Sequence, residues 1–284
     1  MSAAVNAESV PLTHVTPERT CLHWPEYAIE AAALGTFMVS AALFATALYH
    51  PSSPLAASIS HEWIRRVLMG LAMGATAVAI IYSPWGQRSG AHMNPALTLT
   101  FFRLGKVPRY DFVGYVVAQF VGGVAGIALV AAALSNLVSH PAINYVVTTP
   151  GPEGETVAFL AEGAMSFGMM LLVLLMSNQP RVARFTGLCA GLMVWTYIAL
   201  EAPLSGMSIN PARTLGSALL AGDFAGLWIY FTAPPLGMLL AAELYTRTAG
   251  LHRVVCAKLH HPRGPGCVFG CDRRMREAAV GRPA

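Results

Sequence analysis

The residues best placed to do chemistry lie in two copies of one short phrase, one in each half of the chain. Residues 89–96 read Ser-Gly-Ala-His-Met-Asn-Pro-Ala, and residues 205–212 read Ser-Gly-Met-Ser-Ile-Asn-Pro-Ala. Asparagine is a preferred N-cap and proline is favoured at the first helical position, so Asn94 and Asn210 each predict the start of a helix. The asparagine amide and the helix N-terminus both favour oxygen atoms and disfavour cations. Each of these two sites is therefore expected to accept an oxygen atom and to repel a cation.

Other polar residues lie inside apolar segments. Arg213 follows the second phrase directly, and an ionisable residue at such a place usually faces a cavity or pathway, because burial in lipid is costly. Glu30 and Glu162 lie equally deep, each followed by small residues. No nucleophile with an adjacent base and no intramembrane metal cluster is legible, so the sequence does not predict an enzyme.

The composition places the chain in a membrane. Of its 284 residues, 55% are hydrophobic and 11% are charged, which is about half the charge of an average soluble domain. The formal net charge is +4, and eight of the eighteen Lys and Arg residues lie from Arg247 onward, so nucleic acid is not expected as a partner. Residues 1–25 form a polar N-terminal segment before any apolar run, and no secretory signal peptide is expected.

Six apolar stretches are each close to the roughly 20 residues that span a hydrocarbon core. These stretches are residues 27–48, 67–83, 112–135, 157–177, 186–201 and 226–246. Two shorter apolar runs begin at the phrases, Asn94 to Phe102 and Asn210 to Leu220, and neither can span alone. The sequence therefore predicts an all-α polytopic membrane protein with six transmembrane helices and two re-entrant half-helices.

The loops predict orientation and repeats. Basic residues follow the second and fourth crossings and crowd the C-terminal tail, whereas the loop from Leu137 to Thr156 has none. The positive-inside rule then places both termini in the cytoplasm, although Arg65 and Arg66 count against it. With three crossings per half, repeat one (about 26–136) and repeat two (about 156–248) enter the membrane from opposite sides, and such inverted repeats place their site at the midplane.

The stretches before each asparagine should be irregular backbone that lines a pore, because such backbone is tolerated at membrane depth only inside protein or beside a wet cavity. The expected pore-lining residues of these stretches are Gly90, Ala91, His92, Gly206, Ser208 and Ile209. For His92, a packing role is as well supported as pore lining. Two helix N-termini facing each other at the midplane would repel a cation or a hydrated proton.

The membrane region, about residues 26–248, resembles a bacterial-type member of the aquaporin, or major intrinsic protein, family. The matching residues are both Asn-Pro-Ala phrases, Glu30 with Gly35-Thr36, Gln119, Glu162, Arg213 and the Pro-Pro-Leu-Gly of residues 234–237. The resemblance implies a homotetrameric channel in the inner or plasma membrane that excludes protons and ions. It also implies structural roles for Glu30, Gln119 and Glu162, and it places Arg213 in a selectivity filter.

The same resemblance assigns the rest of the filter to Ile198, Met207 and either Met73 or Gly74. Water-selective members pair an aromatic residue with a histidine beside the arginine, and neither is found at these positions. Thr214, Ala218 and Tyr230-Phe231 resemble the water branch of the family. We therefore expect water as the first solute and glycerol-sized neutral solutes as the alternative.

The tail, residues 249–284, is basic and contains cysteine and histidine. Cys256 and His260 are four residues apart, as are Cys267 and Cys271, with a Pro/Gly turn between the pairs. On two short helices each pair would share one face, and three thiolates with an imidazole suit zinc. His261 and His252 are substitute ligands. The competing interpretation is a disordered tail with incidental cysteines; disulfides are not expected in a cytosolic tail.

Three functional classes are compatible with these features. The leading one is a passive channel for water or small neutral solutes. A coupled transporter also uses inverted repeats and broken helices, but it would need an ion-coordinating cluster at the midplane, where only Arg213 and the two asparagines are evident. A membrane-anchored metal or redox sensor is supported by the tail alone.

Overall fold

The computed structural model describes residues 22–261 and 267–271, so Cys21 and the tail beyond Cys271 lie outside the described residues. Within the described ranges, six helices are long and apolar enough to cross a membrane, which confirms the predicted crossings. They are α1 (Trp24–Tyr49), α3 (Glu62–Tyr82), α6 (Arg109–Val138), α7 (Glu155–Ser177), α8 (Thr186–Ser205) and α10 (Leu227–Ala249).

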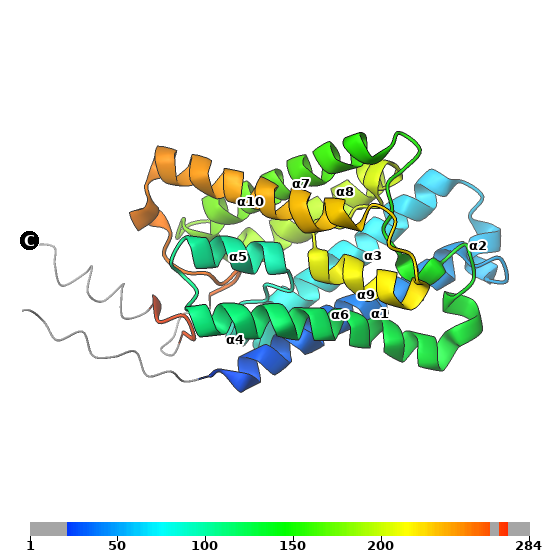
Figure 1. Ribbon diagram of the computed structural model, residues 1–284, viewed down its shortest axis with the longest axis horizontal. Helices are drawn as coiled ribbons and strands as arrows, with labels where there is room; N and C mark the ends of the chain where they lie inside the picture. Colours follow the sequence, from blue (N-terminus) through cyan, green and yellow to red (C-terminus); the bar gives the residue numbers. More distant parts are fainter. Residues whose placement is uncertain (1–21, 262–266, 272–284) are drawn as a thin grey trace, which may run out of the picture.

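Two short helices begin at the asparagine phrases. Helix α5 (Pro95–Arg103) is capped by Asn94, and α9 (Pro211–Ala221) is capped by Asn210. Figure 1 shows α5 and α9 lying end to end between α10 and α6, with their N-terminal ends toward the centre. We call residues 83–103 the first re-entrant loop and residues 205–221 the second.

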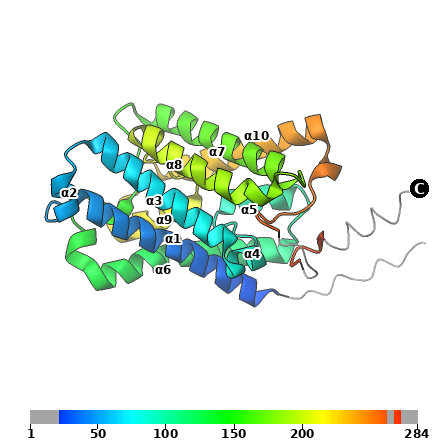
Figure 2. The same cartoon turned by 180° about the vertical axis from the view of Figure 1, so that it is seen from behind.

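The helices pack as two interlocked halves. Helix α1 packs on α6, α7 packs on α10, and α3 packs on α8 between the halves, as the two opposite views show (Figures 1 and 2). Small residues allow the closest approaches: a Cβ on Gly122 would lie 2.1 Å from the carbonyl oxygen of Ala31, and one on Gly237 would lie 2.2 Å from that of Gly163. Such contacts are typical of helix pairs in membranes.

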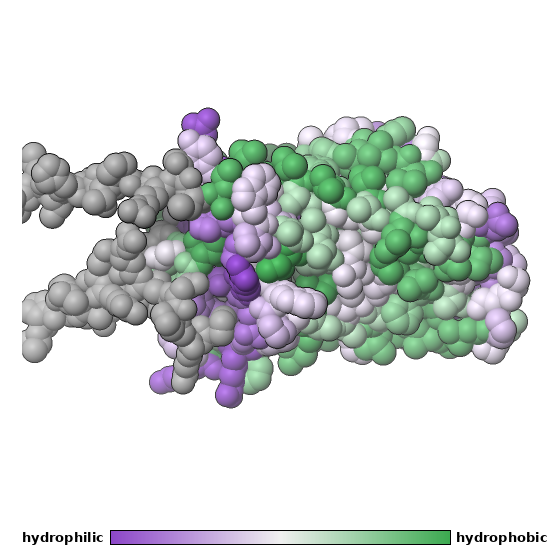
Figure 3. Space-filling model, turned by 90° about the horizontal axis from the view of Figure 1, so that it is seen from below, coloured by the Kyte–Doolittle hydropathy of each residue, from purple (hydrophilic) through white to green (hydrophobic). Residues whose placement is uncertain are grey.

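The surface fits a bilayer. Figure 3 shows hydrophobic residues gathered over the middle of the molecule and hydrophilic residues toward its two ends. Leu129, Leu160 and Leu240 are among the large apolar side chains that are exposed. Helix α1 begins and α10 ends at the same end of the bundle, which we call the terminal side, and the opposite end is the distal side.

Short helices that the hydropathy pattern did not predict complete the connections. Helix α2 (Pro54–Ser58) lies between α1 and α3, and α4 (Pro84–Ser89) opens the first re-entrant loop. Arg65 donates hydrogen bonds to the carbonyl oxygens of Ile59 at 2.7 Å and Ala56 at 2.8 Å, at the C-terminal end of α2. Its position at the distal side therefore has a local structural cause, separate from the charge rule that it opposes.

The remaining described elements are single turns. They are the 3₁₀ helices η1 (Asn144–Val146), η2 (Ala183–Phe185) and η3 (Leu251–Arg253).

Candidate functional site

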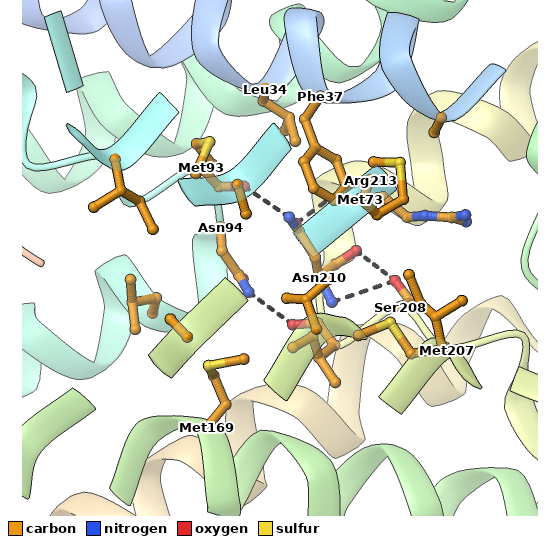
Figure 4. A pocket seen from close by; sticks show the side chains of 18 of the residues that line it. Leu34, Phe37, Met73, Met93, Asn94, Met169, Met207, Ser208, Asn210 and Arg213 are labelled. Carbon is orange, nitrogen blue, oxygen red and sulfur yellow. Dashed lines mark hydrogen bonds between the residues drawn. The ribbon is translucent and has the colours of Figure 1, made fainter. Parts of the chain in front are cut away.

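The centre of the molecule is built by the two asparagines. Each one caps its own half-helix: Asn94 Oδ1 accepts from the Ala96 amide at 2.9 Å, and Asn210 Oδ1 accepts from the Ala212 amide at 3.1 Å. Each then donates from Nδ2 to the opposite loop, Asn94 to the Ile209 carbonyl and Asn210 to the Met93 carbonyl, both at 2.7 Å. Figure 4 shows both side chains in the wall of the cavity.

These bonds between the loops leave hydrogen-bond donors of the two asparagines available to a solute. An amide carries two N–H donors, and each asparagine uses one of them on the opposite loop. The second N–H of each is the donor that a solute oxygen in the cavity would meet. Pro95, Ala96, Pro211 and Ala212 are buried in the half-helices and do not line the cavity.

Glu30 of α1 anchors the first re-entrant loop. Its carboxylate accepts hydrogen bonds from the Ser89 hydroxyl at 2.8 Å and from the backbone amides of His92 at 3.0 Å and Met93 at 2.7 Å. Gln119 of α6 donates to the same carboxylate at 2.9 Å and to Thr98 at 3.1 Å. The carboxylate is buried, and it provides the hydrogen-bond acceptors for backbone N–H groups of the loop that no helix pairs.

Glu162 of α7 does the same for the second loop. It accepts from the Ser205 hydroxyl at 2.8 Å and from the amides of Ser208 at 2.7 Å and Ile209 at 2.6 Å. A tyrosine also holds each loop: Tyr115 donates to the Ser89 carbonyl at 2.7 Å, and Tyr230 donates to the Ser205 carbonyl at 2.5 Å. Neither tyrosine was predicted as a loop anchor from the sequence.

The carboxylates hold strained backbone in place. Ala91, Met93, Met207 and Ile209 have positive φ values of 54°, 50°, 48° and 48°. A left-handed conformation costs an L-residue roughly 1–2 kcal/mol, and such strain persists where surrounding bonds determine it. Nothing in these residue types signals the conformation, so sequence reasoning could not have found it.

A cavity of about 230 Å³ runs beside the two asparagines, from Tyr49 and Arg66 at the distal side to Ile81 and Leu259 at the terminal side. Most of its wall is apolar, from the side chains of Leu34, Phe37, Met69, Met93, Leu97, Met169, Val173, Val194 and Met238. The polar side chains of the wall belong to Tyr49, Arg66, His92, Asn94, Ser208, Asn210 and Arg213. Arg66 and Phe37 were not expected there.

Of the predicted filter residues, Met73, Ile198, Met207 and Arg213 line the cavity, and Gly74 does not. Gly74 differs from the expectation because it faces α8: a Cβ there would lie 2.5 Å from the Gly191 carbonyl oxygen. A shift of one residue turns a helix position by about 100°, which separates Met73 from Gly74. Arg213 Nη1 is buried and has no hydrogen-bond partner in the described part of the chain, so it is available to a solute.

The first re-entrant loop is covered on the terminal side by the tail. His92 and Ala91 line the cavity, but Gly90 does not, because Lys258 and Phe269 lie against it. Both ring nitrogens of His92 are engaged, Nδ1 with the Thr98 hydroxyl at 3.1 Å and Nε2 with the Ala257 carbonyl at 2.8 Å. His92 therefore combines the packing and pore-lining roles that the sequence left open. In the second loop, Gly206, Ser208 and Ile209 all line the cavity.

The tail also brings its cysteines together. Cys256, Cys267 and Cys271 cluster with His261, and not with His260 as expected. The His260 ring instead packs against Tyr82, with ring centroids 4.7 Å apart. The expected short helices are not formed, since residues 254–260 are irregular and residues 268–269 are a turn. Hydrogen bonding with Cys256 and Cys271 lowers the pKa of the Cys267 thiol below its ordinary value.

A half-helix pair capped by asparagine, held by two buried carboxylates and set inside six spans defines a membrane channel fold. Residues 24–245 match the model of the family described as Major intrinsic protein, and the chain belongs to that family. The family is one of membrane channels and not of enzymes.

Similar proteins include two plant aquaporins and one solved structure. Aquaporin NIP3-1 of Oryza sativa subsp. japonica is 37% identical over 178 residues, which are 62% of this chain and 55% of that protein. Aquaporin NIP2-2 of Zea mays is 39% identical over 196 residues, which are 67% of this chain and 64% of that protein. The aquaglyceroporin of Plasmodium falciparum superposes with a TM-score of 0.68 at 22% identity, covering 80% of this chain and 96% of that one.

These similarities confirm the family and the fold. The matched region spans 55% to 64% of the length of these two plant aquaporins. Since these relatives are plant proteins, the comparisons do not single out a bacterial-type member.

Proposed function

We propose that the chain forms a passive pore for water and small uncharged solutes. The observation that carries this proposal is the mixed wall of the cavity: Asn94, Asn210 and Arg213 offer donors, while most of the other lining side chains are apolar. A solute with an oxygen on one side and carbon on the other meets both kinds of wall. A cation would lose its hydration without a matching partner.

Ion exclusion rests on the centre of the pore. The N-termini of α5 and α9 meet there, and each carries about half a positive charge. A water that accepts from both asparagines points its hydrogens away from the centre, which interrupts a proton-conducting chain. Arg213 adds a full positive charge to the wall of the same cavity.

The filter favours a broad choice of solutes. Met73, Ile198 and Met207 stand with Arg213 where a water-selective filter has an aromatic residue and a histidine, so Arg213 is the main donor there. Methionine is flexible and fills irregular space, so the opening adapts to the solute. We propose water as the first solute and glycerol-sized neutral molecules as the second.

Stopped-flow light scattering of proteoliposomes under water, glycerol and urea gradients tests this function. We expect osmotic shrinkage much faster than that of empty liposomes, with no proton conductance. Met73→Trp should lower glycerol permeability roughly tenfold, the size of a single steric effect in a pocket, and lower water permeability less. Leu160→Trp, on the exposed surface of α7, is the matched control. Permeability equal to that of empty liposomes, from folded protein, would overturn the proposal.

Asn210→Asp tests the exclusion of ions. The substitution puts a negative charge at the facing helix N-termini and removes the donor to the Met93 carbonyl. We expect proton or cation conductance to appear, measured with a pH-sensitive dye inside the liposomes. An unchanged, proton-tight pore would contradict the role given to the asparagine pair.

We also propose that the protein lies in the cell membrane as a homotetramer with both termini in the cytoplasm. The basic residues Arg88, Arg103 and Arg109 support the orientation, since they belong to connections on the terminal side. Labelling of single introduced cysteines from either side of the membrane tests the orientation, and mass measurement in detergent tests the tetramer.

A further inference from the structure

Four metal-ligating atoms converge in the tail, outside the pore. The sulfur atoms of Cys256, Cys267 and Cys271 and one ring nitrogen of His261 all lie within 4.8 Å of one another. The Cys256 and Cys267 sulfur atoms are 3.6 Å apart, and His261 Nε2 is 3.0 Å from the Cys271 sulfur. Nothing in the proposed transport of neutral solutes uses these groups.

The spacing fits one tetrahedral ion. Zinc binds thiolate sulfur at about 2.3 Å, which places two sulfur ligands of a tetrahedral site about 3.8 Å apart. The separation of Cys256 and Cys267 is close to that value, and the full spread of 4.8 Å needs only a small contraction. Three thiolates and one imidazole are a ligand set found in structural zinc sites, and thiolates select soft metals over Mg²⁺ or Ca²⁺.

The backbone around the cluster is shaped to bring the ligands together. The Gly270 amide donates to the Cys267 carbonyl at 2.9 Å, and Gly270 has a φ of 63°, which closes a turn between Cys267 and Cys271. Cys256 and Cys271 are buried. Residues 254–260 have no regular secondary structure to fix them, yet Ala257 is fully buried and Lys258 and Leu259 are nearly so.

The ligands bracket the part of the tail that contacts the pore. Between Cys256 and His261, the Ala257 carbonyl bonds to His92, Lys258 Nζ donates to the Gln87 carbonyl at 2.9 Å, and the Leu259 amide donates to the Gly90 carbonyl at 3.2 Å. The Leu259 side chain lines the cavity at its terminal end. Fixing both ends of this segment would therefore fix Leu259 in the pore.

We propose that Cys256, His261, Cys267 and Cys271 bind Zn²⁺ or another thiophilic divalent cation, and that the bound ion clips residues 256–261 over the first re-entrant loop. The metal site stands independently of transport. The effect of the clip on permeability rests on the proposed pore function. Because a site of this kind scarcely exists in an unfolded tail, metal binding also contributes to the folding of this segment.

Metal content of the purified full-length protein tests the site, using an affinity tag without histidine. We expect one zinc ion per chain by elemental analysis, and zinc X-ray absorption showing three sulfur neighbours at about 2.3 Å and one nitrogen. His261→Ala and Cys271→Ser should lose the ion. His260→Ala is the matched control and should keep it. If zinc content equals that of a variant with Cys256, Cys267 and Cys271 all changed to serine, the proposal is overturned.

A disulfide is the competing fate of the cluster. Thiol titration of the unfolded, non-reduced protein should find all the cysteines as thiols once zinc is released. A pair missing from that count, in protein without zinc, would replace the metal site with an oxidised one. The absorption measurement needs no variant, so the test survives if a substitution prevents folding.

Permeability measurements test the effect of the bound ion on the pore separately from metal binding itself. Removing zinc with a strong chelator should raise water permeability, because Leu259 is released from the cavity, and Leu259→Ala should raise it with zinc still bound. Unchanged permeability on removal of a measured ion would overturn the clip. A protein that binds one zinc yet conducts nothing in any state would instead contradict the proposed pore function.

Discussion

The two re-entrant loops are held by equivalent hydrogen bonds, but different parts of the chain cover them. In each loop a buried glutamate from another helix accepts hydrogen bonds from two backbone amides and from a serine hydroxyl. A tyrosine hydroxyl donates to the carbonyl of that serine. The corresponding pairs are Glu30 and Glu162, Ser89 and Ser205, Met93 and Ile209, and Tyr115 and Tyr230.

The covers differ in how they are attached. On the distal side, the connection between α6 and α7 covers the second loop: Thr148 lies against Gly206, and the Gly151 amide donates to the Leu204 carbonyl at 2.9 Å. On the terminal side, Lys258 lies against Gly90 of the first loop. The distal cover is tied to a membrane helix at both ends, and the described part of the tail is tied to a membrane helix, α10, at its N-terminal end. Its other anchor is the cysteine–histidine cluster.

The largest test of the mirrored bonds removes the carboxylates. Glu162→Leu and Glu30→Leu each leave at least three donors without an acceptor, at roughly 1–3 kcal/mol per buried donor. We expect loss of monodisperse protein or a large fall in the unfolding temperature for both variants, measured in detergent.

Glu201→Leu is the control for that test. Both Glu201 carboxylate oxygens are buried and have no hydrogen-bond partner among the described residues, so their removal leaves no donor unsatisfied. The unfolding temperature of the Glu201→Leu variant should not fall. A tolerated Glu162→Leu would show that the loop backbone does not depend on the carboxylate.

Alanine substitutions of the two loop glycines should have effects of intermediate size, and these effects should differ between the distal cover and the tail. Gly90 and Gly206 have φ values of 106° and 76°, so alanine costs roughly 1–2 kcal/mol at either from backbone conformation alone. A Cβ on Gly206 meets the short Thr148 side chain at 3.2 Å and its Cα at 3.3 Å. A Cβ on Gly90 meets the longer Lys258 and Phe269 side chains at 3.2 Å and 3.3 Å, and the Lys258 Cα at 3.4 Å. We expect Gly206→Ala to lower the unfolding temperature more than Gly90→Ala. An equal or reversed order would contradict a firmer distal cover.

The smallest effect belongs to the tyrosines. Tyr115→Phe and Tyr230→Phe each remove one hydrogen bond to a serine carbonyl, worth about 1 kcal/mol. We expect two similar small decreases in unfolding temperature, with permeability retained. A large difference between the two variants would break the equivalence of the halves.

Much of the fold could be predicted because its signals are local. Hydropathy indicated the six spans, and Asn-Pro indicated the half-helix starts, since capping depends on adjacent residues. Met73 and Gly74 could not be separated, because a one-residue uncertainty in register turns the helix face. His261 could not be preferred over His260, because an irregular segment has no periodicity from which to infer which side chains meet. The cover over Gly90 depends on contacts between segments more than 150 residues apart, such as that of His92 with Ala257.

The exchanged bonds of the asparagines have a consequence for biogenesis. Asn94 donates to the Ile209 carbonyl, and the Met93 carbonyl accepts from Asn210, so the second-half partners Ile209 and Asn210 are both absent when the first three spans enter the membrane. The Asn94 side-chain amide cannot form its bond to the second loop until the fifth span and the loop after it have been synthesised. Formation of the pore centre is therefore a late event in translation, and a ribosome stalled before residue 209 would leave an inserted half without a finished channel.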